Sequence, residues 1–143
     1  MNVASILKLK GRQVATARPD ATLLEITTKL SQRRIGAMVI VGDNGQVAGI
    51  VSERDIIRAI AEGGPAALNQ SVSDFMTQNV ISCTEKSAID ELMELMTEGR
   101  FRHLPVMEDG ALVGIISIGD VVKNHVAEVE MEVSAMRSYL STG

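Results

Sequence analysis

Two copies of one seven-residue pattern, Gly49–Asp55 (GIVSERD) and Gly114–Asp120 (GIISIGD), decide how this chain folds. The copies lie 65 residues apart and share a glycine, an isoleucine, a serine and an aspartate. Each copy follows a hairpin signal and runs into an apolar, helix-like segment. A serine and an aspartate delivered to a helix start suit an anion and a ribose diol, respectively. The same pair can also act only as a helix cap.

The residues around the first copy predict a strand, a helix and a β-hairpin that leads into a second helix. Thr22 and Glu25 fit a capping box. The turn sequence GDNG is a hairpin signal between two apolar runs. The expected elements are a strand at Val14–Ala17, a helix at Thr22–Arg33, strands at Ala37–Val41 and Val47–Val51, and a helix at Asp55–Ala61.

The same order of elements restarts after Gly63-Gly64-Pro65. Val80–Ser82 matches Val14–Thr16 at an offset of 66 residues, and Arg100–Met107 matches Arg34–Val41 at the same offset. The chain is therefore a tandem repeat of a β-α-β-β-α unit, in the α/β (α+β) class. Neither half is long enough to bury both faces of its sheet, so we expect the repeats to pack about a pseudo-twofold axis.

We divide the chain into a first repeat at residues 1–64, a second repeat at 65–125 and a C-terminal helical extension at 126–143. The first repeat includes a short amphipathic helix at Met1–Lys10. An exposed basic turn is expected at Lys8–Arg12, and a short helical turn at Val72–Met76 opens the second repeat.

The last segment, Val121–Leu140, carries an apolar seam typical of helix pairing. Its partner is either the N-terminal helix of the same chain or a second subunit. The seam extends past the repeat that would cover it, which favours a subunit. The seam residues are Val122, Val126, Val129, Val133, Met136 and Leu140.

The composition narrows the classes of protein. Hydrophobic residues make up 45% of 143 residues, so a real core is expected. A net charge of −4 and the absence of a basic stripe argue against nucleic-acid binding. No apolar run reaches 18 residues and no signal peptide is seen, so we expect a cytoplasmic protein outside the membrane. The single cysteine, Cys83, is expected to be a buried filler.

With these residues in view, the repeat resembles a cystathionine-β-synthase-type (CBS) domain, and the pair resembles a tandem CBS module. The resemblance rests on the two seven-residue patterns, on RFRHLPVMEDG and on SVSDFMTQNVISC, and it covers nearly the whole chain. The chain is similar to small stand-alone bacterial CBS-pair proteins. The resemblance implies clefts between the repeats that hold AMP, ADP, ATP, NAD(H) or S-adenosyl groups, and association into a homodimer.

The resemblance also implies which residues bind such a ligand. It assigns Asp55 and Asp120 to the ribose and Ser52 and Ser117 to the phosphate side. The basic phosphate candidates are Arg102, His103 and Arg54. Backbone that reads the adenine edge is expected at Val14, Ala15 and Thr16 and at Val80, Ile81 and Ser82, and the residues around the base are Ile35, Gly36, Met38 and Leu104.

The two copies are not equal. Arg102 and His103 align with Gly36 and Ala37, so one cleft has more basic residues than the other. We therefore expect two sites of unequal affinity, or two different ligands.

The sequence gives little support to catalysis. It contains two histidines and one cysteine, without a cluster suited to a metal, and it lacks a phosphate-binding loop and a nucleophile elbow. We expect a regulatory module, with no metal and no catalytic residue, that senses an adenine nucleotide and acts on a protein partner in trans. The alternative is a dimerisation or docking scaffold with vestigial clefts.

Overall fold

The computed structural model describes residues 1–142 and consists of two compact units. Unit 1 contains Met1–Arg12, Ser82–Glu108 and the residues from Val113 onward, whereas unit 2 contains Gln13–Ile81 and Asp109–Leu112. Each repeat therefore supplies most of one unit. The N-terminal helix, which the sequence groups with the first repeat, packs in the unit of the second repeat.

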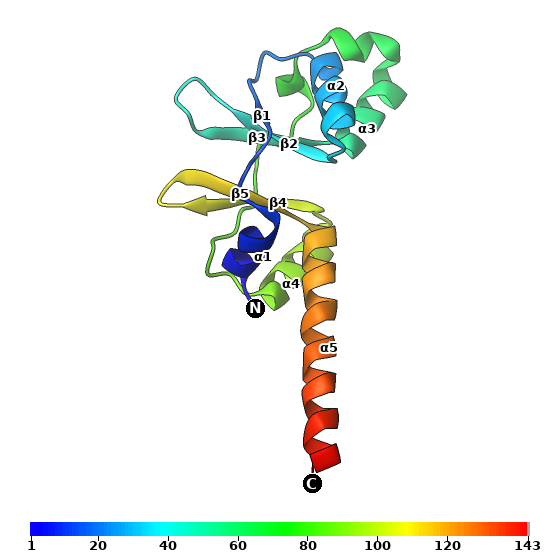
Figure 1. The fold of residues 1–143 in the computed structure, drawn as a ribbon. Helices are drawn as coiled ribbons and strands as arrows, with labels where there is room; N and C mark the ends of the chain where they lie inside the picture. Colours follow the sequence, from blue (N-terminus) through cyan, green and yellow to red (C-terminus); the bar gives the residue numbers. More distant parts are fainter. Residues whose placement is uncertain (143) are drawn as a thin grey trace. The chain divides into compact units, whose positions relative to one another are not determined.

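Unit 2 is built on a three-stranded sheet with two helices packed on it (Figure 1). The first strand pairs in parallel with the second, and the second pairs antiparallel with the third. In chain order the elements are β1 (Thr16–Ala17), α2 (Leu23–Arg33), β2 (Ala37–Val41), β3 (Val47–Ser52), α3 (Glu53–Gly63) and the 3-10 helices η1 (Pro65–Asn69) and η2 (Val72–Asp74).

Helix α2 has the boundaries that its local sequence dictates. The Thr22 hydroxyl accepts a hydrogen bond from the Glu25 backbone N–H at 3.2 Å, and the Glu25 carboxylate accepts one from the Thr22 N–H at 3.4 Å. The predicted capping box is therefore confirmed. The helix ends where Arg34 adopts the left-handed conformation, with φ of 55°. The core that α2 shares with the sheet is aliphatic and includes Leu23, Ile26, Leu30, Met38, Ile40 and Val51.

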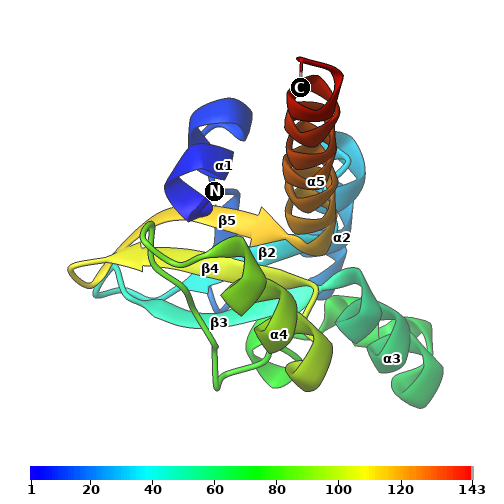
Figure 2. The same cartoon turned by 90° about the horizontal axis from the view of Figure 1, so that it is seen from below.

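Unit 1 has a two-stranded β-hairpin with three helices on one side of it (Figure 1). Figure 2 looks roughly along the last helix and shows the other two beside it. The elements are α1 (Val3–Lys10), α4 (Ile89–Gly99), β4 (His103–Glu108), β5 (Ala111–Ser117) and α5 (Ile118–Thr142).

Helix α5 packs on unit 1 only through its first turns. Val121 is buried, and Asn124, His125 and Glu128 are half-buried on the same face. The N-terminal ammonium group of Met1 pairs with Glu128 at 3.3 Å. Beyond Glu130, every side chain as far as residue 141 is exposed. Within residues 1–142, no helix has an apolar stretch long enough to cross a bilayer.

The first strand of each repeat is shorter than predicted. β1 contains Thr16 and Ala17, although the Val39 N–H still donates to the Ala15 carbonyl at 3.3 Å. Val80–Ser82 forms no strand, and only the next residue bridges to β4. Pro105 stands at the position of Val39 in the second repeat and has no N–H to donate. This missing donor explains why the predicted strand is absent.

Three other predicted segments also differ from the structure. Helix α3 begins at Glu53, two residues before the predicted start at Asp55, because Ser52 is its N-cap. The turn predicted at Val72–Met76 is the 3-10 helix Val72–Asp74. Lys8 and Lys10, predicted in an exposed turn, belong to the last turn of α1.

Candidate functional site

The first copy of the seven-residue pattern forms a complete capping box where β3 meets α3. The Ser52 N–H and hydroxyl donate to Asp55 Oδ2 at 2.8 and 3.1 Å, and the Asp55 N–H donates to Ser52 Oγ at 3.4 Å. Both side chains are half-buried. The interpretation of Ser52 and Asp55 as a helix cap is therefore correct. The cap uses only one of the two carboxylate oxygens of Asp55.

The other oxygen, Asp55 Oδ1, accepts no hydrogen bond from residues 1–142. Its nearest cationic neighbour is Arg58, whose Nη1 lies 3.9 Å away and whose side chain is 68% exposed. Arg54, the predicted phosphate ligand, is exposed and makes no ion pair within the described chain. The carboxylate therefore keeps an oxygen that can accept a ligand hydroxyl.

The residues predicted to surround a base in the first repeat do not all share one environment. The Gly36 carbonyl accepts the Glu53 N–H at 3.0 Å, so Gly36 lies directly beside the start of α3. Ile35 and Gly36 line a depression of about 700 Å³ between α2 and α3, together with apolar Ile56, Ile57 and Ile60. Met38, by contrast, is fully buried in the core, as is its counterpart Leu104 in unit 1.

The second copy forms the same box where β5 meets α5. The Ser117 N–H donates to Asp120 Oδ2 at 2.9 Å, and the Asp120 N–H donates to Ser117 Oγ at 3.1 Å. Asp120 Oδ1 again accepts no hydrogen bond from residues 1–142. The two repeats therefore present the same Ser–Asp arrangement at a strand–helix junction.

Lys10 distinguishes the second site from the first. Its ammonium group donates to Asp120 Oδ2 at 2.6 Å and to the Ile115 carbonyl at 3.0 Å. In the first repeat the corresponding carbonyl, that of Ile50, accepts the backbone N–H of Thr77 at 2.9 Å instead. At the second site a lysine ammonium group therefore donates to this carbonyl, whereas at the first site a backbone N–H donates to it.

The contact with Lys10 changes the acidity of Asp120. Partial burial acts to raise the pKa of this carboxyl, but the hydrogen bonds from Lys10 and from the Ser117 backbone and hydroxyl outweigh it. The pKa of Asp120 therefore lies below its ordinary value of 3.8. Burial also raises the pKa of the Cys83 thiol to about 11, which makes this cysteine a poor nucleophile at neutral pH.

The predicted basic pair, Arg102 and His103, is close to the second site, because the backbone of Arg102 contacts the start of α5. The Arg102 carbonyl accepts the Ile118 N–H at 2.8 Å, matching the contact of Gly36 in the first repeat. The Arg102 side chain is exposed, and His103 is half-buried at the start of β4.

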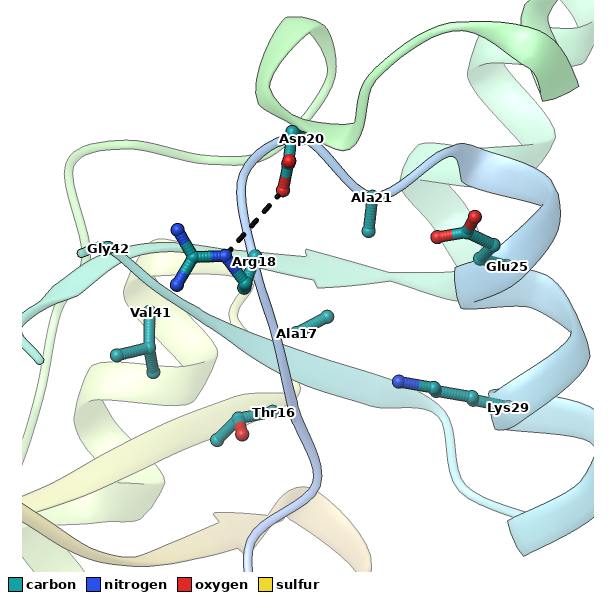
Figure 3. Close-up of a pocket in the computed structure, with 9 residues that line it drawn as sticks. All are labelled: Thr16, Ala17, Arg18, Asp20, Ala21, Glu25, Lys29, Val41 and Gly42. Atoms are coloured by element: carbon teal, nitrogen blue, oxygen red, sulfur yellow. Dashed lines mark ion pairs between the residues drawn. The ribbon is translucent and has the colours of Figure 1, made fainter.

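Of the segments predicted to read adenine, the first leads into β1 and the second, Val80–Ser82, forms no strand. Val14 and Ala15 are half-buried, and Thr16 is exposed. Thr16 lines an open depression of about 530 Å³ in unit 2 (Figure 3). In that depression Arg18 pairs with Asp20 at 3.8 Å. In unit 2 Val80 and Ile81 are half-buried, whereas Ser82, which belongs to unit 1, is exposed.

Sequence reasoning did not assign Lys10 to the site. The sequence shows Lys10 as a basic residue at the end of the predicted N-terminal helix, but no local pattern links it to Asp120. It was missed because residues 8–12 were interpreted as a solvated basic turn. Only the packing of α1 in unit 1 brings Lys10 to Asp120.

The repeat, its paired boxes and its topology match a known family model. The model of the CBS domain matches twice, at residues 7–62 and 72–126. The chain belongs to the CBS-domain family. The predicted family and the mixed α/β class of a CBS pair with a long C-terminal helix are both confirmed. CBS-domain pairs of this kind are typically non-catalytic.

Solved CBS-domain structures resemble the whole pair. The CBS-domain containing protein ATU1752 from Agrobacterium tumefaciens is 52% identical, with a TM-score of 0.84 over 85% of this chain and 91% of that one. The CBS domain protein PAE2072 from Pyrobaculum aerophilum, solved with AMP, is 27% identical, with a TM-score of 0.75 over 84% and 89%. The CBS domain pair of MJ0100, solved with 5′-methylthioadenosine and S-adenosyl-L-methionine, is 25% identical, with a TM-score of 0.80 over 90% and 98%.

Proposed function

We propose that this CBS-domain pair is a regulatory module that senses an adenosine-derived ligand through the Ser52–Asp55 and Ser117–Asp120 boxes. The observation that carries the proposal is the second carboxylate oxygen, Oδ1, which the cap leaves without a hydrogen bond in both repeats. Relatives of the same fold bind AMP, methylthioadenosine and S-adenosylmethionine, which share an adenosine group. A ribose hydroxyl is a suitable donor to such an oxygen.

The surroundings of each box suit the rest of such a ligand. The serine hydroxyl and the first N–H groups of α3 and α5 favour a negative group such as phosphate. The apolar depression at Ile35 and Ile57 gives the first repeat a surface for an uncharged ring. ADP, ATP and NAD(H) belong to the same proposal because they share the adenosine group.

The proposal predicts that Asp55→Asn and Asp120→Asn each weaken binding at their own site. Asparagine can keep the capping hydrogen bond through its carbonyl oxygen, but its amide presents a donor where the ribose needs an acceptor. We expect affinity for AMP to fall about 10- to 100-fold at the altered site, as for loss of a charge-assisted hydrogen bond. Calorimetric titration of ligand-stripped protein measures this.

A matched control separates ligand binding from folding. Glu62→Gln changes an exposed acidic residue near the other end of α3, outside the depression, and is expected to leave AMP affinity unchanged. If wild-type protein binds none of AMP, methylthioadenosine, S-adenosylmethionine, ATP or NADH while remaining folded, the sensor proposal is wrong. The docking scaffold is then the better interpretation.

We also propose that the module associates with a second copy through α5, and that ligand occupancy is passed to a partner protein in trans. The seam of α5, Val122 to Leu140, is 42% to 72% exposed and lies apart from the face that packs on unit 1. Exposed apolar residues at this spacing are typical of a paired helix.

The charges beside the seam favour a parallel pair of helices. In a parallel pair Glu132 lies opposite Arg137 of the second copy, which is an attractive contact. In an antiparallel pair of the same seam, Glu130 and Glu132 each meet their own copy, and Lys123 meets Arg137. All of these antiparallel contacts are between like charges.

A further inference from the structure

Lys10 places a charged group at the Ser117–Asp120 box in unit 1, and no described residue does the same at the Ser52–Asp55 box in unit 2. Its ammonium nitrogen lies 2.6 Å from Asp120 Oδ2 and 3.0 Å from the Ile115 carbonyl oxygen. At the matching place in unit 2, the Ile50 carbonyl accepts the uncharged Thr77 N–H, and Met76 packs on Gly49 as Leu7 packs on Gly114. The two Ser–Asp boxes therefore differ by one full positive charge within hydrogen-bond distance of the carboxylate.

The geometry leaves Lys10 with capacity for a further partner. An ammonium group has three N–H donors, and the contacts with Asp120 and Ile115 use two of them. The side chain is 33% exposed, so the remaining donor can reach a group from solution. Asp120 Oδ2 already accepts from Lys10 and from the Ser117 N–H, which leaves Oδ1 as the acceptor for a ribose hydroxyl.

We infer that Lys10 sets the charge preference of the Ser117–Asp120 site, making it select phosphorylated adenosine ligands over uncharged or cationic ones. This inference rests on the proposed function. Lys10 offsets the negative charge of Asp120, which would otherwise repel a phosphate held at the same helix start. Among the described residues, the first box has only the largely exposed Arg58 nearby, 3.9 Å from Asp55 Oδ1, so it discriminates less by ligand charge.

Three adenosine ligands of different charge test the inference. AMP is a dianion, methylthioadenosine is uncharged and S-adenosylmethionine is a cation, so ratios of their affinities isolate the effect of charge. The titrations use the full chain with Asp55→Asn, which confines high-affinity binding to the second site. Substitution Lys10→Met removes the positive charge and keeps an unbranched side chain of similar length.

We expect Lys10→Met to lower the ratio of AMP to methylthioadenosine affinity about tenfold, the scale of one partly screened charge a few ångströms away. The ratio of AMP to S-adenosylmethionine affinity falls further, because the cation gains from the exposed carboxylate. Lys10→Arg keeps the charge and retains most of the selectivity. Lys8→Met removes the same charge from an exposed position of α1 and leaves both ratios unchanged.

The outcomes separate this inference from the proposed function. If Asp120→Asn abolishes the remaining binding but Lys10→Met leaves the ratios unchanged, the Ser–Asp site stands and the role of Lys10 is wrong. If Lys10→Met changes the affinity for all three ligands by one common factor, Lys10 only blocks the site, and the inference is again overturned. If Asp120→Asn has no effect on any ligand, the proposed function fails for this repeat.

Discussion

At the scale of single residues, the glycine, the serine and the aspartate that the two seven-residue patterns share each have a physical role. A Cβ atom added to Gly49 would lie 2.6 Å from Met76 Sδ, and one added to Gly114 would lie 2.7 Å from Leu7 Cδ2. The pattern therefore needs glycine because another segment of the same unit packs directly on the strand. The serine and the aspartate close the capping box, which sequence reasoning anticipated as the simpler explanation.

This close approach predicts that Gly114→Ala destabilises the protein by about 1–3 kcal/mol, the usual cost of overpacking a buried contact. Gly119→Ala is the matched control, because its added Cβ would meet only Ser117 Oγ at an ordinary 3.6 Å. Alanine is also the better helix former, so Gly119→Ala is expected to be neutral or slightly stabilising. Urea unfolding measures both, and equal effects of the two substitutions would contradict the packing argument.

The lowered pKa of Asp120 predicts a pH-dependent contribution to stability. A carboxyl whose pKa is depressed on folding contributes fully above its unfolded value, near 3.8, and the contribution is lost as the pH falls through the lower folded value. Lys10→Met is therefore expected to cost about 0.5–1 kcal/mol at pH 7, as for a partly exposed ion pair. The difference from wild type should shrink as the pH is lowered below 3.8. A cost that stays constant over this range would show that Lys10 stabilises α1 without acting through Asp120.

At the scale of elements, the sequence predicted most helices and hairpin strands because their signals are local. The capping box at Thr22, the hairpin turn after Val41 and the apolar spacing of α4 each act within a few residues. The first strands depend on pairing with a distant segment, and there the prediction failed. Pro105 is visible in the sequence, but its effect on Val80–Ser82 follows only from the alignment of the two hairpins.

The exposed apolar seam of α5 predicts a dimer, and one charged substitution in that seam should dissociate it. Val129→Glu places a charge in the exposed seam, and we expect it to produce monomers without loss of helix content. Sedimentation velocity at matched concentrations measures the change. Ser134→Glu adds the same charge outside the seam and serves as the control. A wild-type protein that sediments as a monomer at high concentration would contradict the proposed pairing.

The parallel orientation of the dimer can be tested on the same helix. Leu140→Cys places a thiol at the C-terminal end of the seam, where a parallel pair brings two copies together and an antiparallel pair holds them far apart. We expect a disulfide-linked dimer on mild oxidation. The natural Cys83 does not interfere, since its thiol is buried and its pKa is raised to about 11.

At the scale of the whole molecule, the repeat and its family could be predicted from the sequence, but the assignment of segments to units could not. The two patterns, their spacing and their hairpins all lie in the order of the residues. The sequence of the N-terminal helix does not indicate which unit it joins, because its apolar face could pack on any apolar surface. Its place in unit 1 depends on tertiary contacts, such as Val3 donating to the Ser87 carbonyl at 3.0 Å. Lys10 was missed for the same reason.

Because α1 belongs to unit 1, its position affects the order of folding during synthesis on the ribosome. Residues 13–81 supply almost all of unit 2 and emerge early, so this unit can fold while synthesis continues. Residues 1–10, although made before residues 13–81, must wait for β4, β5 and the start of α5 before their partners exist. Until then the apolar side chains of Val3, Ile6 and Leu7 have nothing of their own unit to cover them. Helix α1 thus precedes unit 2 in synthesis but reaches its native place after unit 2 can fold.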